Sequence, residues 1–304
     1  MFIDGHADTL SKILAEQASL FSNNAHFDIT RALASRVQMQ VLALFTSEKS
    51  SEEARKNIYK QIDYFYDQMH EIEDIAFHVM EADDLTRLSN DRIGLMLHLE
   101  GGDAVGRELS RISDLYSRGV RSMGLTWNYG NAIATGILDV EPEYGLTDFG
   151  REVIVELNRL KMVVDVAHAS HKTFYDVLES TKSPLWVSHA NVFSLCRHPR
   201  NLTDDQIKAI KEVNGIIGIC FVPGFVGPEN NLDHLVDHIC YICEMIGIDH
   251  AALGSDFDGT DITVIPDVSK LTTLIDKLQH RQFTIEEIKK IAGGNLLRLL
   301  KQIL

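Results

Sequence analysis

Residues 203–221, TDDQIKAIKEVNGIIGICF, combine a helix-like segment with an apolar run, and this combination decides the fold class. The segment Thr203–Val213 opens with Thr203 and has Gln206 three residues later, which is the pattern of a capping box. The run that follows, Gly215–Phe221, is almost continuously apolar. Such a run is typical of a strand that is buried on both faces of a parallel sheet. The stretch therefore predicts one helix-then-strand step of an α/β fold.

The same character recurs along the whole chain of 304 residues. Seven further strand-like runs are Phe2–His6, Val37–Phe45, Ile93–Leu99, Val120–Leu125, Met162–Val166, Leu185–Ser188 and His250–Gly254. Helix-like segments separate most of them, including Ser51–Glu73, Thr147–Leu160 and Leu232–Ile246, and two closing helices follow, the last opening with Thr284 and Glu287. Eight strand-then-helix units predict a (β/α)8 TIM barrel, with residues 1–304 as a single domain that ends in closing helices.

Two alternatives to this prediction remain at this point: a different type of sheet, and one additional strand. A doubly wound open sheet is the alternative fold, but it normally carries a glycine-rich phosphate turn after its first strand. Residues 4–8, DGHAD, do not form such a turn. The segment Ile75–Met80 could add a further short strand.

Composition and charge narrow the class of protein. The chain has 29 Lys and Arg against 44 Asp and Glu, a formal net charge of −15. This balance argues against nucleic-acid binding, which needs clustered Lys and Arg. No apolar run reaches the roughly 18 residues of a membrane span, and the first ten residues lack the pattern of a signal peptide. We therefore expect a cytoplasmic protein that binds neither nucleic acid nor membrane.

Cysteine usage points to packing, not to chemistry. Four cysteines are too few for a disulfide scaffold. Cys240 and Cys243 form a lone CxxC inside an apolar, helix-like stretch, and neither a second CxxC nor a Cys/His knuckle accompanies it. Core packing is therefore favoured over a zinc or redox role for this pair.

Five of the eight runs end in residue types that bind metals. The endings are His6-x-Asp8, His98-x-Glu100, Asp165-x-x-His168, Ser188-His189 and Ser255-Asp256-x-Asp258. In a (β/α)8 barrel the carboxyl ends of all strands meet at one rim, where catalysis takes place. His, Asp and Glu are the ligand set of a divalent metal such as zinc. The sequence therefore predicts a metal site at this rim.

The order of these residues suggests a site for two ions. His6 and Asp8 are two apart on an extended chain, so their side chains point to the same side and can chelate one ion. The carboxylate of Glu100 can bridge two ions, and the imidazoles of His168 and His189 can complete the second. Two ions roughly 3.5–4 Å apart can share a water and lower its pKa, which yields a hydroxide aimed at a carbonyl.

Plainer interpretations exist for single members of this set and for other histidines. Any one member alone could be a polar strand end or a hydrogen-bonded core residue. His98 precedes Glu100 on the same face and is expected inside the barrel, not as a ligand. His234 and His238 are four apart on a helix, a spacing that can hold zinc. That helix should lie outside the barrel and offers no third ligand, so a solvated or packed face is favoured.

The chain resembles the membrane (renal) dipeptidase family of zinc peptidases, peptidase family M19, in a bacterial-type form. The similar segments are DGHADTL at 4–10, LMLHLEGGDAV at 95–105, DVAHASHKTFYDVLESTKSPLWVSHAN at 165–191, HPRNLTDDQI at 198–207, GSDFDG at 254–259 and GGNLLRLL at 293–300. They follow in order along nearly the whole chain, so the resemblance does not rest on one short motif. The fold of the family is a (β/α)8 barrel, which agrees with the strand count.

The resemblance implies a site that binds two Zn²⁺ ions per chain. His6 and Asp8 would bind the first ion, Glu100 would bridge both, and His168 and His189 would bind the second. It further implies a catalytic role for Glu100, because the bridging ligand positions the shared hydroxide.

The resemblance also implies three residues that contact the substrate. Arg200, in the segment HPRN, would hold the terminal carboxylate with two parallel hydrogen bonds. Asp256 would contact the substrate and carry a proton from the nucleophile to the leaving amine. Renal-type members carry a histidine in the strand-4 segment, and here GLTWNYGNAIATG at 124–136 has Trp127 at that position. Indole donates one hydrogen bond but cannot become cationic, so the range of substrates stays open.

Together these features predict a zinc-dependent dipeptidase that hydrolyses the amide bond of dipeptides with a free carboxylate through a metal-bridging hydroxide. The first alternative is a metal hydrolase of the same fold that acts on N-acyl amino acids, lactams, phosphoesters or another small amide or ester. A mononuclear enzyme and a non-enzymatic binding protein on a degenerate barrel are further alternatives, although the latter should have lost a ligand. By analogy with related enzymes we expect a homodimer.

Overall fold

Nine parallel strands form one sheet in this computed structural model, which describes residues 2–139, 144–227, 229 and 231–304. The strands are β1 (Phe2–Ala7), β2 (Val37–Phe45), β3 (Ala76–His78), β4 (Ile93–Glu100), β5 (Val120–Gly124), β6 (Val163–Asp165), β7 (Trp186–Ala190), β8 (Ile216–Ile219) and β9 (Ala251–Leu253). Each run predicted from the sequence overlaps one of these strands, with ends that differ by a few residues.

The sheet closes into a barrel. Its order is β2-β1-β9-β8-β7-β6-β5-β4-β3, and a further pairing of β2 with β4 joins the two ends of the row. The ring therefore contains eight strands, and the predicted (β/α)8 TIM barrel is confirmed. The open doubly wound sheet is excluded because the pairing of β2 with β4 closes the ring.

The segment Ile75–Met80 does contain a strand, β3. It pairs with Ile93–Leu95 at the start of β4, while β5 pairs with β4 further along, from Leu97 to Leu99. The extra strand therefore shares one edge of β4 with β5 and leaves the eight-stranded ring intact.

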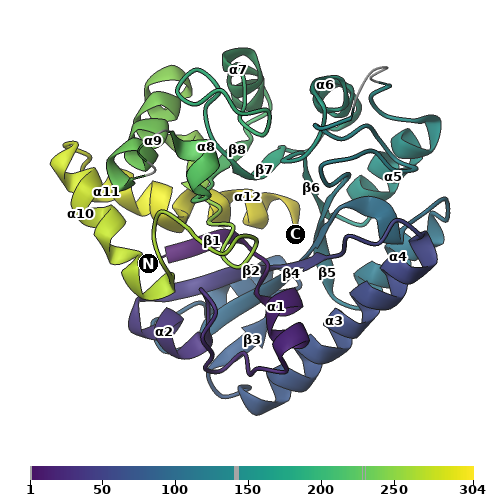
Figure 1. Cartoon of the computed structure of the whole chain (residues 1–304), viewed down its shortest axis with the longest axis horizontal. Helices are drawn as coiled ribbons and strands as arrows, with labels where there is room; N and C mark the ends of the chain where they lie inside the picture. Colours follow the sequence, from purple (N-terminus) through teal and green to yellow (C-terminus); the bar gives the residue numbers. More distant parts are fainter. Residues whose placement is uncertain (1, 140–143, 228, 230) are drawn as a thin grey trace.

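Helices surround the strands in Figure 1. They are α1 (Thr9–Glu16), α2 (Ile29–Ala34), α3 (Ser51–Glu71), α4 (Ser110–Ser117), α5 (Asp148–Arg159), α6 (His171–Ser180), α7 (Asp204–Glu212), α8 (Pro223–Val226), α9 (Leu232–Ile246), α10 (Thr272–His280), α11 (Ile285–Lys289) and α12 (Asn295–Ile303). This arrangement buries both faces of the sheet, which explains why the strand sequences are apolar almost throughout.

Two capping boxes predicted from the sequence are present. The hydroxyl of Thr203 accepts a hydrogen bond from the backbone N–H of Gln206, and the side chain of Gln206 accepts one from the N–H of Thr203. Thr284 and Glu287 repeat this exchange at the start of α11. In both helices the box satisfies backbone N–H groups that have no partner inside the helix.

The helix α12 closes the end of the barrel where the strands begin. In Figure 1 it crosses the centre of the ring. Leu296, Leu299 and Leu300 belong to a buried cluster with Ile3 of β1 and Trp186 of β7. The opposite end, where the strands finish, is therefore the end that is left for a site.

The outer helix α9 carries the CxxC and the spaced histidines, and among the described residues neither pair belongs to a candidate metal site. Cys240 and Cys243 are half-buried and pack against the core, as predicted. His238 is buried, its Nδ1 accepts a hydrogen bond from the N–H of Val192, and its Nε2 donates to the carbonyl oxygen of Val226. Both ring nitrogens of His238 are thus committed to the backbone, which confirms the packed alternative for this residue.

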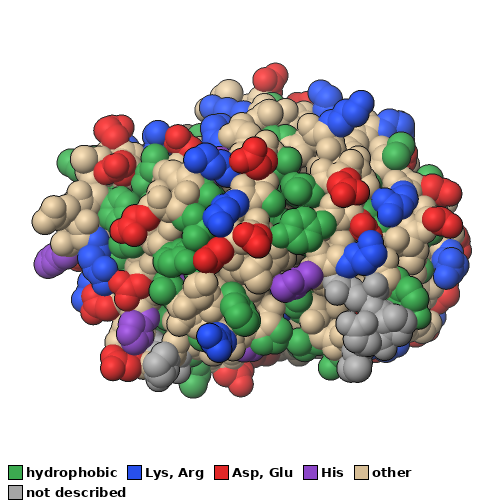
Figure 2. Space-filling model, turned by 90° about the horizontal axis from the view of Figure 1, so that it is seen from above, with side chains coloured by type: hydrophobic (Ala, Val, Ile, Leu, Met, Phe, Trp, Pro, Cys, Tyr) green, Lys and Arg blue, Asp and Glu red, His purple; other side chains and the backbone are tan. Residues whose placement is uncertain are grey.

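Within the described residues, none of the helices is both long enough and apolar enough to cross a bilayer. Figure 2 shows one face of the molecule, on which acidic and basic side chains are intermixed with apolar ones. The described residues of that face show no large cluster of Lys and Arg.

Candidate active site

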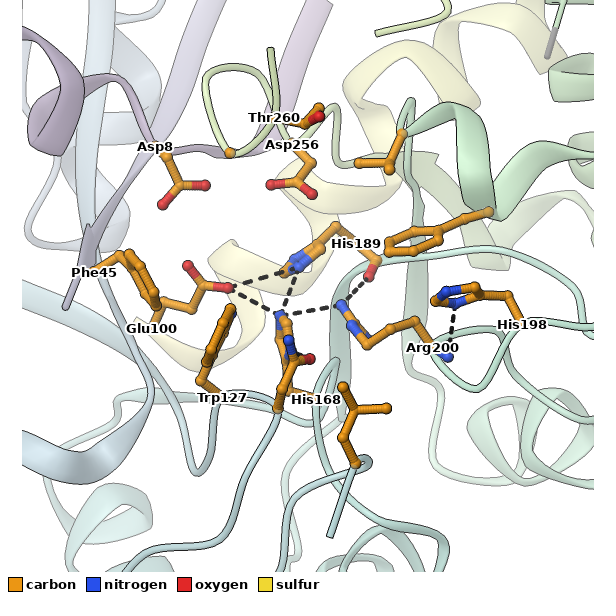
Figure 3. Close-up of a pocket in the computed structure, with 15 residues that line it drawn as sticks. Asp8, Phe45, Glu100, Trp127, His168, His189, His198, Arg200, Asp256 and Thr260 are labelled. Carbon is orange, nitrogen blue, oxygen red and sulfur yellow. Dashed lines mark hydrogen bonds and ion pairs between the residues drawn. The ribbon is translucent and has the colours of Figure 1, made fainter. Parts of the chain in front are cut away.

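A cavity of about 410 Å³ lies at the carboxyl ends of the strands and is lined by most of the site residues predicted from the sequence, while His6 is buried and does not line it. Figure 3 shows the side chains of Asp8, Glu100, His168, His189 and Asp256 around a common space. His6 lies in β1, Glu100 ends β4 and His189 lies in β7, while Asp8, His168 and Asp256 follow the ends of their strands. The lining residues predicted from the sequence are Asp8, Glu100, Trp127, His168, His189, Arg200 and Asp256.

The first part of the cluster centres on His6. Its Nε2 lies 3.4 Å from Oδ2 of Asp8, 3.5 Å from Oε2 of Glu100 and 3.9 Å from Oδ1 of Asp256. Ligand-type atoms of His6, Asp8 and Asp256 all lie within 4.8 Å of one another. A single cation could therefore reach His6 and two carboxylates.

The second part of the cluster lies on the other side of Glu100. Its Oε1 is 2.9 Å from Nε2 of His168 and 3.8 Å from Nε2 of His189. The other oxygen, Oε2, faces His6, so the two oxygens of one carboxylate face different histidines, while ligand-type atoms of His6, Glu100 and His189 also lie within 4.8 Å of one another. This is the geometry that a bridging carboxylate requires.

Unpaired polar atoms in the cluster indicate that a cation fits there. Nε2 of His6 and Oδ1 of Asp8 are buried and have no hydrogen-bond partner among the described residues. A buried polar atom without a partner costs free energy, and metal coordination satisfies it as well as a hydrogen bond does. Imidazole and carboxylate are also the donor set that divalent zinc takes. The residues present therefore fit a divalent metal.

Burial and crowded charges shift the pKa values of several residues in the cluster. Burial and the charge of Glu100 raise the pKa of Asp8 well above its usual range. Burial opposes ionisation of Glu100 too, but His6 and His168 outweigh it and hold the pKa of Glu100 well below its usual range. Burial and the charge of Arg200 lower the pKa of His168 to about 4. Burial lowers the pKa of His6, but the charge of Glu100 and the contacts with Asp8 and Glu100 outweigh burial and raise it well above its usual range. Because a metal site needs neutral imidazoles and ionised carboxylates, a cation that binds here would displace protons from His6 and Asp8.

Arg200 is buried in the wall of the cavity, where its guanidinium contacts backbone carbonyls and an imidazole. It donates to the carbonyl oxygens of Ala167 and His189, the latter at 3.1 Å, and lies 3.1 Å from Nε2 of His168. Within the described part of the chain, no carboxylate forms an ion pair with it. Burial lowers the pKa of the guanidinium, but an arginine stays charged in proteins. The cavity therefore contains a buried cation that can accept an anionic ligand.

Asp256 follows β9 in a left-handed backbone conformation, with φ of 59°. Its N–H donates to the carbonyl oxygen of His6 at 3.1 Å, which fixes the loop against β1. Burial and the charge of Glu100 raise the pKa of the Asp256 carboxyl. A Cβ on residue 259 would lie 2.2 Å from Oδ1 of Asp256 and would clash with it. Gly259 therefore provides the space that the carboxylate occupies.

Aromatic side chains line the opening of the cavity. The rings of Phe45 and Trp127 have centroids 5.1 Å apart, and the ring of Trp127 lies 6.2 Å from that of His168. On the other side the ring of His198 stacks on Phe225 at 4.4 Å. The cavity thus combines an apolar mouth with a charged floor.

Two buried Asp–Ser pairs below the cluster share one geometry. Asp165 accepts from the N–H of Ser188 through Oδ1 at 2.9 Å and from its hydroxyl through Oδ2 at 2.6 Å. Asp4 accepts from the N–H of Ser255 at 2.8 Å and from its hydroxyl at 2.6 Å. Each serine immediately precedes a residue of the cluster. The two pairs therefore hold the ends of β7 and β9 to neighbouring strands.

His98 lies inside the barrel, as expected. Its Nε2 is 3.3 Å from Oδ2 of Asp165 and its Nδ1 is 3.0 Å from the hydroxyl of Ser122. Burial disfavours ionisation of Asp165, but the contacts with His98 and the hydrogen bonds from Ser188 outweigh it and lower the pKa of the carboxyl. His98 thus supports the layer below the cluster.

The sequence interpretation missed several residues of the site. Phe45 ends a predicted strand, but the rule that located the ligands selected metal-binding residue types and therefore passed over an apolar residue. Asn128, whose Oδ1 lies 2.9 Å from Nδ1 of His168, and His198 and Phe225 lie outside the strands, where the sequence carries no comparable signal. Asp4 was passed over because it lies within a strand instead of at its end.

Comparisons with known proteins show the family to which this chain is similar. The family model described as membrane dipeptidase (peptidase family M19) matches residues 1–304. An uncharacterized protein in the pqqA 5′ region of Klebsiella pneumoniae is 35% identical over 237 residues, which cover 74% of this chain and 88% of that protein. An uncharacterized dipeptidase of Schizosaccharomyces pombe is 37% identical over 224 residues, or 70% of this chain, and the match spans 54% of that protein.

A crystal structure also resembles this fold. It is a metallopeptidase from Rhodobacter sphaeroides, liganded with a phosphinate mimic of the dipeptide L-Ala-D-Ala. The TM-score is 0.94 at 23% identity, and the match covers 100% of this chain and 99% of that one. At this identity the likeness concerns the fold.

Proposed function

Because this chain belongs to the membrane dipeptidase family and is a metallo-dipeptidase, we propose that it uses two zinc ions to hydrolyse dipeptides that carry a free terminal carboxylate. The single observation that carries this proposal is the position of Glu100, whose Oε2 faces His6 and whose Oε1 faces His168 and His189. The residues that would hold the two ions are His6, Asp8, Glu100, His168 and His189.

Divalent cations in such a site supply Lewis acidity, which lowers the pKa of water and polarises an amide carbonyl. The chain itself supplies the orientation. Arg200 binds the substrate carboxylate through its guanidinium, whose planar N–H groups match the two oxygens of a carboxylate. Because Arg200 lies 3.1 Å from Nε2 of His168, the carboxylate would be held next to the candidate ligands. A dipeptide bound in this way places its amide bond over the cluster.

Asp256 is proposed to move the proton. Its carboxylate lies beside the cluster, with Oδ1 3.9 Å from Nε2 of His6. There it would accept a proton from the attacking water and deliver it to the amine nitrogen as the amide C–N bond breaks. One proton thus leaves the water and reaches the leaving group.

The apolar mouth is proposed to select the side chains of the substrate. Trp127 and Phe45 form one wall and Phe225 the other. A volume of about 410 Å³ lies within the roughly 300–1,000 Å³ that is common for small-molecule sites. The fixed carboxylate site and the limited space favour a dipeptide over a longer peptide.

A substrate panel combined with metal analysis tests the proposal. Purified protein saturated with zinc should hold two ions per chain by elemental analysis and should hydrolyse L,L- or L,D-dipeptides. Glu100→Gln, which keeps the shape but weakens the bridge, should lose metal and activity together. Activity on N-acyl amino acids, lactams or phosphoesters without dipeptide hydrolysis would overturn the substrate class, and one ion per chain at saturation would overturn the two-ion site.

A further inference from the structure

The imidazole of His189 contacts a hydroxyl on one side and the cluster on the other. Its Nδ1 lies 2.8 Å from the hydroxyl oxygen of Ser188, and its Nε2 lies 2.9 Å from Nε2 of His168. A neutral imidazole carries one hydrogen, on either nitrogen. Only the form with hydrogen on Nδ1 leaves a lone pair on Nε2 for a cation. The position of this hydrogen therefore decides whether His189 can be a ligand.

Asp165 controls the hydroxyl of Ser188. Its Oδ1 accepts from two backbone N–H groups, those of Ala167 at 3.0 Å and Ser188 at 2.9 Å. Its Oδ2 accepts from the hydroxyl of Ser188 at 2.6 Å and faces Nε2 of His98 at 3.3 Å. Both oxygens are buried and surrounded by donors, so the carboxylate acts only as an acceptor.

The hydrogen of the Ser188 hydroxyl is therefore committed to Asp165. A hydroxyl has one hydrogen to donate and two lone pairs to accept with. Toward His189 the oxygen of Ser188 can only accept, so Nδ1 of His189 must donate. This chain of donors places the imidazole hydrogen on Nδ1 and directs the free lone pair of Nε2 into the cluster.

We propose that Asp165 is a positioning residue for the candidate metal centre and that it acts through Ser188 to hold His189 in the Nδ1–H form. The inference rests on the proposed function insofar as His189 is taken as a metal ligand. The form of the imidazole can be measured without any substrate, so the two proposals fail separately.

Asp165→Asn reverses the donor and acceptor roles in the hydrogen bonds that run from residue 165 through Ser188 to His189. It keeps the shape of the side chain. The two backbone N–H groups at Oδ1 require an oxygen there, so the new –NH₂ group takes the place of Oδ2. It then donates to the hydroxyl oxygen of Ser188, whose hydrogen turns to Nδ1 of His189. The imidazole must carry its own hydrogen on Nε2, where it blocks a cation. Ser188→Ala instead removes the relay and leaves both forms of the imidazole accessible.

Asp4→Asn is the matched control. Asp4 binds Ser255 with the same two hydrogen bonds and is equally buried, but among the described residues no imidazole contacts the hydroxyl of Ser255. If that hydroxyl turns away from residue 4, it can donate to the carbonyl oxygen of His6 at 3.0 Å. This variant disturbs an Asp–Ser pair without changing the hydrogen of His189.

Two measurements on this chain test the proposal. The first is zinc affinity of the loaded protein, by competition with a chromophoric chelator. We expect Asp165→Asn to lose roughly 10- to 100-fold and Ser188→Ala to lose less. The second is long-range ¹H–¹⁵N NMR of histidine-labelled, metal-free protein at pH 8, with His189 assigned through His189→Gln. We expect Nδ1–H in the wild type and in Asp4→Asn, and Nε2–H in Asp165→Asn.

Several results would overturn the proposal. An Nε2–H form of His189 in the wild type would do so without any variant, even if Asp165→Asn does not fold. So would a loss of zinc affinity that is as large in Asp4→Asn as in Asp165→Asn, because a general packing defect would then explain both. A greater loss in Ser188→Ala than in Asp165→Asn would show that the serine contact alone matters.

Discussion

The Nε2 atoms of His168 and His189 lie 2.9 Å apart on the floor of the cavity. His168 cannot donate toward its neighbour, because its Nδ1 faces the amide oxygen Oδ1 of Asn128 at 2.9 Å and must carry the hydrogen. With His189 in the form argued above, the lone pair on its Nε2 faces the lone pair on Nε2 of His168, and the guanidinium of Arg200 lies 3.1 Å from the latter. The pair is unfavourable in isolation and becomes favourable when a cation lies beside both nitrogens.

This contact predicts that zinc stabilises the folded protein and that the stabilisation requires His189. Zinc should raise the melting temperature of the wild type, because a ligand that binds only the folded state stabilises it. His189→Ala should lose most of this increase. In chelator, where the two nitrogen atoms face each other without a metal ion, the variant should melt within a few degrees of the wild type. Differential scanning fluorimetry with and without zinc measures both effects, and an unchanged zinc response in His189→Ala would contradict the assignment.

Arg200 should contribute to binding of the substrate carboxylate. Arg200→Met removes the charge and both parallel hydrogen bonds, so kcat/KM for a free dipeptide should fall by roughly 100-fold, about 3 kcal/mol. The C-terminal amide of the same dipeptide lacks the carboxylate and serves as the control substrate. In the variant, the ratio of kcat/KM for the free acid to kcat/KM for the amide should be smaller than in the wild type. Equal losses on both substrates would assign Arg200 to a structural role, through its bonds to Ala167 and His189.

Gly254 should tolerate no side chain. A Cβ there would lie 1.8 Å from the carbonyl oxygen of Ser188 and 3.2 Å from Cα of His189. Gly254→Ala should therefore push β9 away from β7 and cost about 3 kcal/mol or more in the free energy of unfolding. A Cβ on Gly224 in α8 would meet no atom of the described residues within 4 Å, so Gly224→Ala is the matched control. Urea unfolding of both variants measures the free energy of unfolding. Equal values for the two variants would contradict the close contact between Gly254 and the carbonyl oxygen of Ser188.

The free energy of unfolding should depend on pH through His78. Burial and the charge of Arg121 lower the pKa of His78 to about 4 from its ordinary value of 6.5. The unfolded chain then takes up a proton more readily than the folded one, so this contribution is complete above pH 6.5 and is lost as the pH falls toward 4. At about 1.4 kcal/mol per pKa unit, a shift of this size corresponds to about 3 kcal/mol.

His78→Asn isolates that contribution. Its amide places a polar atom near the position of Nδ1, which lies 3.4 Å from the hydroxyl of Tyr66, but does not titrate. Between pH 6.5 and 4 the variant should lose less stability than the wild type in urea titrations. Parallel stability curves for the two proteins over this range would remove His78 from the acid response.

Much of the barrel and of the candidate ligand set could be predicted from the sequence. Strands buried on both faces must be apolar, so Val37–Phe45 was recognised with the bounds that β2 has. Strand ends were less certain where hydrogen bonding changes partner. In β8 the N–H of Cys220 turns to the side chain of Asn191 and that of Phe221 to the carbonyl of Ser255, so the strand ends at Ile219 before its apolar run does.

The contacts around the ligands could not be predicted in this way. Asn128 supports His168 from a loop, and its position depends on how that loop folds over the cavity. The guanidinium of Arg200 reaches carbonyl oxygens of two other strand ends, which no local pattern encodes. Such contacts follow from the closure of the ring and from loop paths, not from periodicity.

The sequence by itself determined which residue types stand at the carboxyl ends of the strands, because apolar periodicity locates each strand and a closed barrel gathers those ends at one rim. Only the tertiary structure decided which atoms of these residues face one another. Asp4 meets Ser255 across 251 positions of the chain, and Asp165 meets Ser188 across 23. The register between neighbouring strands sets both contacts, and this register arises from packing of the whole ring.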